Sequence, residues 1–525
     1  METTTAKAVD SKTLWKVIGA SSLGTLIEWY DFYIFGSLAI VISTKFFPAD
    51  NPTAAFLSTL ATFAAGFVVR PFGALFFGRL GDIIGRKYTF MVTLLIMGLS
   101  TFAIGLVPGY ETIGFAAPIL VLTFRLLQGL ALGGEYGGAA TYVAEYSEPE
   151  KRGFRTSWIQ TTATFGLFIS LGVIMVTKNS MSEETFQDWG WRVPFLISVV
   201  MVVVSYFIRK NMEESPLFKK AKVAGKTSSN PLKESFGNRY NFKFVLLALF
   251  GAAMGQGVVW YAGQFYALSF LQNVCKVDFD QTNYIIGAGL LGGTGFFVFF
   301  GWLSDKIGRK TVMLAGMLIA ILTYRPIFDK IYQTADAANK EVVEGSQKVD
   351  VHEVPAEGSA DIVKTTVTTT AYTDGSLLKE TVKERLANGD ASATALVSKG
   401  KSMHVGSSSF WTLALLSFIL VLYVTMVYGP IAAFLVEMFP VKIRYTSMSL
   451  PYHIGNGIFG GLLPAIATYL VAKSQHINEA AIAAGQAAPV DKPYLEGLWY
   501  PIIIAGTSFI IGVLYVSNKK RNIIE

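Results

Sequence analysis

The sequence predicts an all-α membrane protein in which about twelve transmembrane helices form two pseudo-symmetric six-helix bundles. Three observations predict this fold class. First, 52% of the 525 residues are hydrophobic and only 15% are charged, and the mean hydropathy is +0.44, which is far from the average of soluble globular proteins. Second, long apolar runs recur along the whole chain. Third, two segments of the first half recur in the second half.

Each membrane-crossing helix needs roughly 20 apolar residues. The first run is too long for the apolar region of a signal peptide and has no small-residue cleavage site, so we take it as the first span. On this basis the expected spans are residues 17–43, 54–77, 88–107, 115–141, 155–177, 192–209, 244–272, 283–303, 311–328, 410–433, 446–472 and 498–517.

The segment between the sixth and seventh spans is rich in lysine and arginine, and such loops face the cytoplasm. Both termini are therefore expected on the cytoplasmic side. The expected organisation is an N-terminal tail (1–16), a first bundle (17–209), a cytoplasmic linker (210–243), a second bundle (244–517) and a C-terminal tail (518–525).

Composition also excludes several function classes. The single cysteine, Cys275, cannot form an internal disulfide, and the four histidines lie too far apart in sequence to indicate a metal site. We expect no cofactor. The net charge of +7 is explained by basic residues beside membrane spans, so we expect a lipid bilayer and no nucleic acid as partner.

Two segments of the first half recur in the second half, so the chain contains an internal repeat. GRLGDIIGRK at 78–87 returns as GWLSDKIGRK at 301–310, an offset of 223, and EYGGAATYVAEYSEPEKR at 135–152 aligns with VYGPIAAFLVEMFPVKIR at 427–444, an offset of 292. The difference between the offsets, 292 − 223 = 69, is the number of residues that the second half has gained. Only the polar stretch near 329–407 can hold them.

This insert (329–407) is expected on the outer face. It contains the alternating, β-prone run DIVKTTVTTTAYTDGSLL with a turn signal at Asp374-Gly375, followed by SLLKETVKERL, for which we expect a short helix. Two interpretations are open: a solvated, partly ordered loop, or a small folded cap that acts in access or partner binding.

The repeated motifs predict contacts that form in one arrangement of the two bundles and break in another. The glycines of each GRK loop allow a tight reversal between spans, and the aspartates can accept hydrogen bonds from exposed N–H groups at a neighbouring helix start. The expected gating residues are Gly78, Asp82, Gly85, Arg86, Glu145, Arg152, Asp305, Arg309, Glu437 and Arg444.

With these motifs, the chain resembles the major facilitator superfamily over nearly its full length, except for the insert. The segments EWYDF (28–32), RPFGALFFGRLGDIIGRK (70–87), RLLQGLALGGEYGGAA (125–140), WGWRVPF (189–195) and EESPLF (213–218) are similar to the metabolite:proton symporter family. The resemblance implies the major facilitator fold, a place in the plasma (inner) membrane, and symport with H⁺ of organic acids such as oxoglutarate, citrate and shikimate or of zwitterions such as proline and betaine. We expect a monomer.

Five ionisable residues lie within spans of the first half: Glu28, Asp31, Arg70, Arg125 and Glu135. Each costs about 2.5–3.5 kcal/mol at the centre of a membrane helix, so pairing or hydration must offset that free energy. Because Glu28 and Asp31 are spaced i, i+3, they share a helix face. If the fourth span faces them, Arg125 can neutralise one of these carboxylates.

The second copy of the repeat serves as a control. The offsets place Gly293 opposite Arg70, Ser417 opposite Arg125 and Val427 opposite Glu135. Because the second half lacks these charges, the architecture does not require them, and a functional role is favoured.

The expected proton-coupling residues are Asp31, Glu28, Arg125 and Glu135. An adjacent cation lowers the pKa of a carboxyl and desolvation raises it, so alternation between the two environments couples proton occupancy to conformation. In sugar porters, which the chain resembles at these places, the corresponding pair does this work. The alternatives are a permanent ion pair that fixes helix packing for Asp31 and Arg125, and a snorkelling anchor for Arg70.

Cargo contacts are expected from polar and aromatic residues of both halves, because aromatic rings offer stacking surfaces and amides offer hydrogen bonds. Each of them alone could also serve helix packing. The expected cargo-binding residues are Arg125, Tyr136, Gln128, Arg70, Gln256, Trp260, Tyr261, Gln264, His453 and Asn456.

The sequence therefore predicts a secondary active transporter that moves a small organic acid or zwitterion together with H⁺ by alternating access. An enzyme is disfavoured because no nucleophile constellation or cluster of histidines or thiols is recognisable. An ATP-driven pump is disfavoured because Lys220 and Ala395 stand where a phosphate-binding loop needs glycine. A proton-independent uniporter, an antiporter and a non-transporting membrane sensor stay open.

Overall fold

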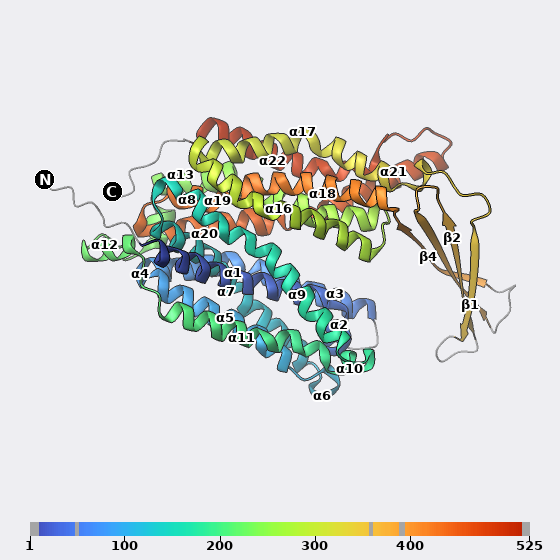
Figure 1. Ribbon diagram of the computed structural model, residues 1–525, viewed down its shortest axis with the longest axis horizontal. Coiled ribbons are helices and arrows are strands. Elements are labelled where there is room, and N and C mark those ends of the chain that lie inside the picture. The colour runs from blue at the N-terminus through green and yellow to red at the C-terminus, as the bar shows by residue number, and fades with distance from the viewer. Residues whose placement is uncertain (1–9, 48–51, 356–360, 388–393, 517–525) are drawn as a thin grey trace.

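The computed structural model describes residues 10–47, 52–355, 361–387 and 394–516. Most of the expected N-terminal tail and the whole tail 518–525 lie outside these residues. Two helical bundles lie side by side, the first half in blue and green and the second in yellow and red (Figure 1). A small β-sheet extends from one end of the molecule.

The first bundle is built from eleven of the described helices. They are α1 (Ser11–Ser37), α2 (Ala39–Phe46), α3 (Pro52–Val68), α4 (Arg70–Ile83), α5 (Arg86–Leu106), α6 (Tyr110–Ile113), α7 (Ala116–Tyr146), α8 (Arg152–Ser157), α9 (Thr162–Asn179), α10 (Glu183–Asp188) and α11 (Val193–Lys210). The short helix α12 (Pro216–Val223) belongs to the segment between the bundles.

The second bundle contains α13 (Arg239–Ala248), α14 (Met254–Tyr261), α15 (Ala267–Ser269), α16 (Phe279–Ile307), α17 (Arg309–Ala335), α18 (Ser407–Tyr428), α19 (Ile431–Met438), α20 (Arg444–Ile454), α21 (Leu463–Ala483) and α22 (Trp499–Tyr515). The helices α13, α14 and α15 form one rod with π-helical turns between them. Such turns are frequent at functional sites.

Within the described residues, ten helical stretches are long and apolar enough to cross a membrane. The pair α1 and α2, bent by 66°, would add an eleventh. This bend follows Gly36 and Ser37, and Gly/Ser pairs are common sites of sharp kinks. At the place of the second expected span, α3 has 17 residues and is followed by α4 after the single residue Val69. The all-α membrane fold class is thus confirmed.

Each bundle has its own apolar core. In the first, Tyr30, Phe35 and Ile104 pack with Trp191, and all four are completely buried. The core of the second bundle also takes in Tyr136 and its neighbours on α7. The two halves are therefore separately packed bodies that meet along α7, between α4 and α20, and between α8 and α16.

The insert folds as a four-stranded antiparallel sheet in the order β1-β2-β3-β4. Its strands are β1 (Lys348–Pro355), β2 (Ile362–Ala371), β3 (Leu377–Leu386) and β4 (Thr394–His404). The predicted turn is present: Gly375 has φ +82° and its N–H donates to the Tyr372 carbonyl at 3.0 Å.

The expected helix over SLLKETVKERL is wrong, because this segment is strand β3. Lysine, glutamate, leucine and arginine favour a helix locally, but β2 and β4 pair with β3 along its whole length. These cross-strand hydrogen bonds override the local propensity.

The base of the sheet is fixed to the second bundle. The Met403 N–H donates to the Lys276 carbonyl at 2.7 Å, and the Asp278 N–H donates to the Met403 carbonyl at 2.9 Å, just before α16 begins. The Asp374 carboxylate accepts from Lys340 Nζ at 2.5 Å and from Ser409 Oγ, near the start of α18, at 3.1 Å. The sheet therefore moves with the second bundle.

The base of the sheet should loosen in acid. Burial raises the pKa of Asp374, but hydrogen bonds from Lys340 and Ser376 outweigh it and lower the pKa from 3.8 to about 2. A depressed folded-state pKa contributes stability above the unfolded value, and this contribution is lost as pH falls from about 4 to about 2. We expect amide hydrogen exchange in β3 and β4 to accelerate across that window in the full chain. Asp374→Asn should remove most of this pH dependence; an equal dependence in both proteins would contradict the assignment.

Candidate functional site

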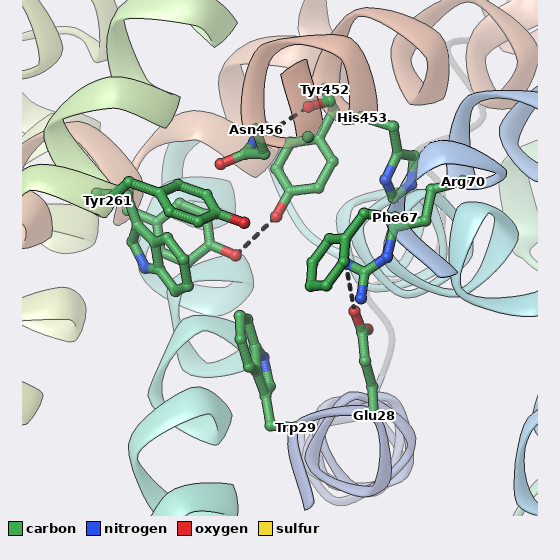
Figure 2. A pocket seen from close by; sticks show the side chains of 11 residues that line it. Glu28, Trp29, Phe67, Arg70, Tyr261, Tyr452, His453 and Asn456 are labelled. Carbon is green, nitrogen blue, oxygen red and sulfur yellow. Dashed lines mark hydrogen bonds and ion pairs between the residues drawn. The ribbon is translucent and has the colours of Figure 1, made fainter. Parts of the chain in front are cut away.

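A small, partly enclosed cavity lies between the two bundles (Figure 2). Helices α1, α3 and α4 of the first bundle and α14, α18 and α20 of the second contribute its walls. The lining residues are Glu28, Trp29, Phe67, Arg70, Trp260, Tyr261, Tyr428, Tyr452, His453, Asn456 and Gly457.

Glu28 and Arg70 form a loose ion pair at this cavity. Arg70 Nη1 lies 3.7 Å from Glu28 Oε1, and the two side chains point toward each other in Figure 2. Arg70 begins α4, where Pro71 in the first turn separates this helix from α3. The Arg70 guanidinium also lies over the Phe67 ring, 4.3 Å from its centroid. The arginine therefore faces the cavity from a helix start.

Several polar atoms around the cavity have no hydrogen-bond partner among the described residues. They are Glu28 Oε2, Arg70 Nε, Trp260 Nε1 and His453 Nε2. Buried polar atoms are nearly always satisfied in folded proteins, and exceptions call for an explanation. A polar ligand or water in the cavity would supply these partners.

Aromatic rings form much of the remaining wall. The Trp29 and Trp260 centroids are 5.3 Å apart across the two bundles, and Tyr261 packs against Trp260 at 4.9 Å. The hydroxyls of Tyr428 and Tyr452 share a hydrogen bond of 2.7 Å. The cavity thus combines one anion, one cation and electron-rich ring faces.

Asp31 is held in a buried network behind the cavity wall. Asp31 Oδ2 accepts from Arg125 Nη1 at 3.1 Å, and Oδ1 accepts from Thr101 Oγ1 and Gln128 Nε2, each at 2.9 Å. Arg125 Nη1 also donates to Gln128 Oε1 at 2.8 Å. The first and fourth spans do face each other as the spacing predicts, and Arg125 pairs with Asp31.

Glu135 forms an ion pair with Arg209, which the sequence does not predict. Its Oε1 accepts from Arg209 Nη2 at 2.7 Å and its Oε2 from Thr93 Oγ1 at 2.8 Å, and Arg209 Nη1 donates to the Phe90 carbonyl at 2.6 Å. Gly24 of α1 provides the space, because a Cβ there would overlap the Arg209 guanidinium. All of these residues belong to the first bundle, so movement between the bundles leaves the pair intact.

Five expected cargo contacts do not line the cavity. Arg125 and Gln128 form hydrogen bonds with Asp31 and with each other. Tyr136 lies under Tyr452, with parallel rings 3.7 Å apart. Gln256 exchanges two hydrogen bonds with Asn456, at 3.1 and 3.0 Å, and so supports a lining residue from behind. Gln264 is buried in the π-helical turn Ala262–Tyr266.

The first latch, formed by Asp82, Arg86, Glu145 and Arg444, closes one side of the interface between the bundles. Asp82 accepts from the backbone N–H groups of Tyr445 and Thr446, at 3.3 and 2.8 Å, where α20 begins. Glu145 Oε1 lies 2.9 Å from Arg444 Nη1 and 3.4 Å from Arg86 Nη2, and all three side chains are fully buried. Gly78 and Gly85 accompany this latch: a Cβ on Gly78 would lie 2.9 Å from Thr446 Cα, and Gly85 has φ +140°.

The second latch repeats the arrangement with the halves exchanged. Asp305 of α16 accepts from the N–H groups of Gly153 and Phe154, at 2.9 and 2.7 Å, where α8 begins. Glu437 lies 3.3 Å from Arg152 and 3.2 Å from Arg309. Each aspartate accepts from a neighbouring helix start, as the sequence predicts, and in the structure this helix belongs to the opposite bundle. The structure is therefore closed where the GRK loops lie.

Some site residues were not foreseen. Trp29, Phe67, Tyr428, Tyr452 and Gly457 line the cavity. Only Tyr428 carried a sequence signal, because it aligns with Tyr136 in the repeat. Arg209 is the last residue of the sixth expected span and stands beside the basic linker, so the sequence does not indicate it as the partner of Glu135.

The comparisons with known proteins agree with this fold. The family "Sugar (and other) transporter" matches residues 16–228, and "MFS/sugar transport protein" matches residues 140–328. A structure titled as the proton:xylose symporter XylE bound to 6-bromo-6-deoxy-D-glucose covers 98% of both chains at 14% identity with a TM-score of 0.62, which shows a shared fold.

Curated relatives are transporters rather than enzymes. The proline/betaine transporter of Escherichia coli K12 is 36% identical over 328 residues, or 61% of this chain and 65% of that protein. The inner membrane metabolite transport protein YhjE and the alpha-ketoglutarate permease of the same strain are 37% and 36% identical, over 59% of this chain and 72% and 71% of theirs. The match thus spans about two thirds of each relative's length. From these matches, the chain belongs to the major facilitator superfamily of membrane transporters.

Proposed function

We propose that this protein is a secondary active transporter that carries a small zwitterion or organic anion together with H⁺ across the plasma (inner) membrane. The observation that carries this proposal is the cavity between the bundles, where Arg70 and Glu28 face each other and keep unpartnered polar atoms. Two bundles joined by paired latches support alternating access around that cavity.

The chemistry of the cavity favours a zwitterion. Arginine binds carboxylates through its fork of N–H donors, and aromatic faces attract quaternary ammonium groups. Arg70 would hold the carboxylate of a betaine or of proline, while Glu28 beside Arg70 and the Trp29 and Trp260 rings would face its cationic end. The matched proline/betaine transporters support this class. An organic acid, held by Arg70 and His453, is the second candidate, and the matched alpha-ketoglutarate permease supports it.

We assign proton coupling to Asp31 and Arg125. We assign to Glu28 the role of the carboxylate that contacts the cargo. Asp31 is buried and receives three hydrogen bonds, so its proton affinity depends on whether Arg125 stays beside it. Glu135 is paired with Arg209 inside one bundle. We therefore propose that Glu135 holds α7 in place and does not carry the proton. Glu135→Gln should therefore lower thermal stability while proton-driven uptake, measured per folded protein, keeps its pH dependence.

The proposed orientation follows from the basic linker. If residues 210–243 lie in the cytoplasm, the two latches close the cytoplasmic end and the sheet stands outside. One chain supplies both walls of the cavity, which supports a monomer as the transporting unit.

A binding experiment distinguishes the two cargo classes. With the purified protein at fixed pH and without a gradient, Glu28→Gln should weaken glycine betaine binding at least tenfold, because opposite unit charges about 4 Å apart attract by roughly 4 kcal/mol at the effective dielectric of such a site. The same change should leave oxoglutarate binding equal or tighter. Arg70→Gln should weaken both, and Arg70→Lys should restore part of the loss. If Glu28→Gln leaves betaine binding unchanged, the zwitterion proposal is wrong.

The alternative functions predict different experimental results. A uniporter or antiporter would move cargo without importing protons, and a non-transporting sensor would bind cargo without moving it. Uptake into proteoliposomes separates the transporters from the sensor, and the direction of proton movement separates the transporters from one another.

A further inference from the structure

The two faces of the outer sheet differ in their charge pattern. Residues directly opposite each other on neighbouring antiparallel strands point to the same face. One face, which we call the lysine face, contains two similar cross-strand rows. The first row is Lys348, Thr369, Lys379 and Ser402, and the second is His352, Thr365, Lys383 and Ser398, each in the order β1 to β4.

On the lysine face each basic side chain has only hydroxyl residues opposite it across the neighbouring strands. Thr369 separates Lys348 from Lys379, and Thr365 separates His352 from Lys383. The three lysines are exposed and form no ion pair with any residue that the structure describes.

The row between the two basic rows is Asp350, Val367, Thr381 and Gly400. Gly400 leaves open space there, since a Cβ on it would meet nothing within 4 Å.

The opposite face has its charges balanced. Lys364 stands between Glu353 and Glu384 in the register, and Lys401 Nζ lies 2.7 Å from Glu380 Oε1. In these rows the opposite face thus holds as many glutamates (Glu353, Glu380 and Glu384) as lysines (Lys364, Lys399 and Lys401), whereas the lysine face holds three lysines and the single carboxylate of Asp350. A difference of this kind within one sheet indicates that the lysine face has an anionic partner outside this chain.

From this pattern we propose that the lysine face binds an anionic polysaccharide. The two rows are four residues apart along each strand, or roughly 13 Å, and the two lysines of the first row are two strands apart, or roughly 10 Å. This spacing suits anionic groups that repeat along a polymer. The hydroxyls between the cations can bond to sugar hydroxyls and carboxylates.

The composition of the face disfavours a protein partner. The described residues of β1 to β4 include no Phe, Tyr or Trp, whereas these residues are enriched and lysine is depleted at the centres of protein interfaces. With His352 as its one ring among these rows, the face also offers no row of rings on which successive nucleic-acid bases could stack. Binding would be electrostatic and would weaken with salt. The proposal is independent of the cargo and of proton coupling.

The test uses the full chain in neutral detergent and polygalacturonate as the probe. Lys379→Gln/Lys383→Gln removes two charges from the lysine face, and Lys399→Gln/Lys401→Gln removes two charges from the opposite face as the matched control. We expect the unaltered chain and the control to bind equally, and the lysine-face variant to bind about tenfold or more weakly, because each lysine near an anionic surface contributes roughly 1 kcal/mol. Thermal unfolding of both variants checks that the sheet is intact.

Three results would overturn the proposal. Equal weakening of polygalacturonate binding in the two variants would mean that binding depends only on the net charge of the sheet. Binding of polyglutamate, or of phosphatidylglycerol vesicles, as tightly as polygalacturonate would make the partner an acidic protein or a lipid surface. No binding of polygalacturonate to the unaltered chain at low salt would leave the lysine face without this partner.

Discussion

Asp31→Asn is expected to abolish the accumulation of cargo that a proton gradient drives. A proton that moves down 100 mV supplies about 2.3 kcal/mol, which corresponds to roughly fifty-fold accumulation of a neutral zwitterion. Asp31 is the carboxylate that Arg125, Thr101 and Gln128 surround, and an amide in its place cannot take up or release a proton. Labelled cargo counted in proteoliposomes under an imposed gradient measures the loss.

The single variant also leaves Arg125 buried without its counter-ion, which costs about 3–5 kcal/mol of stability. The double variant Asp31→Asn/Arg125→Ser removes both charges and so avoids this cost. If the pair carries the proton, the double variant should equilibrate cargo and ignore the gradient. If the pair only holds helices together, the double variant should still accumulate cargo, and the proton role would move to Glu28.

Glu145→Gln is expected to open the end of the molecule that carries the latches. Glu145 is fully buried between Arg86 and Arg444, and Ser215 also donates to it. Without its charge, Arg444 loses its carboxylate partner while Arg86 keeps Asp82, and a buried charge left unpaired costs about 3–5 kcal/mol in the closed arrangement. A shift of 3 kcal/mol changes the ratio of closed to open molecules by roughly 150-fold.

Cysteine labelling measures this opening. The only native cysteine, Cys275, is buried and can be replaced by alanine, so that Ser449→Cys becomes the only reactive site. Ser449 is buried against Gly137 of α7 at the interface between the bundles. Maleimide should label it much faster in the Glu145→Gln background. Glu437→Gln is the matched control from the second latch and should act more weakly, because Glu437 is 13% exposed. Equal labelling with and without Glu145 would show that its charge does not hold this end closed.

The sequence predicted those features that repeat or that follow helical spacing. The apolar runs predicted the spans, and the two copies of the GRK loop led to the aspartates that meet opposite helix starts. The facing of Asp31 and Arg125 followed from stripes on two helices. In each case a periodic pattern or a duplicated motif carried the prediction.

Features that depend on tertiary contacts could not be predicted in this way. The aromatic wall gathers Trp29, Tyr428 and Tyr452 from helices far apart in the chain. Arg125 does not line the cavity because its guanidinium donates hydrogen bonds to Asp31 and Gln128. Strand β3 has a helical composition but pairs on both sides. Local propensity cannot reveal such partners.

Proton movement during cargo uptake tests the central claim most directly. The protein in proteoliposomes with an internal pH dye would receive glycine betaine, proline or oxoglutarate outside. We expect one of these compounds to acidify the interior, and the Asp31→Asn/Arg125→Ser variant to take up the same compound without acidification. Uptake by the unaltered protein that leaves the internal pH unchanged would contradict proton symport, and the buried charges would then serve only to hold the helices together.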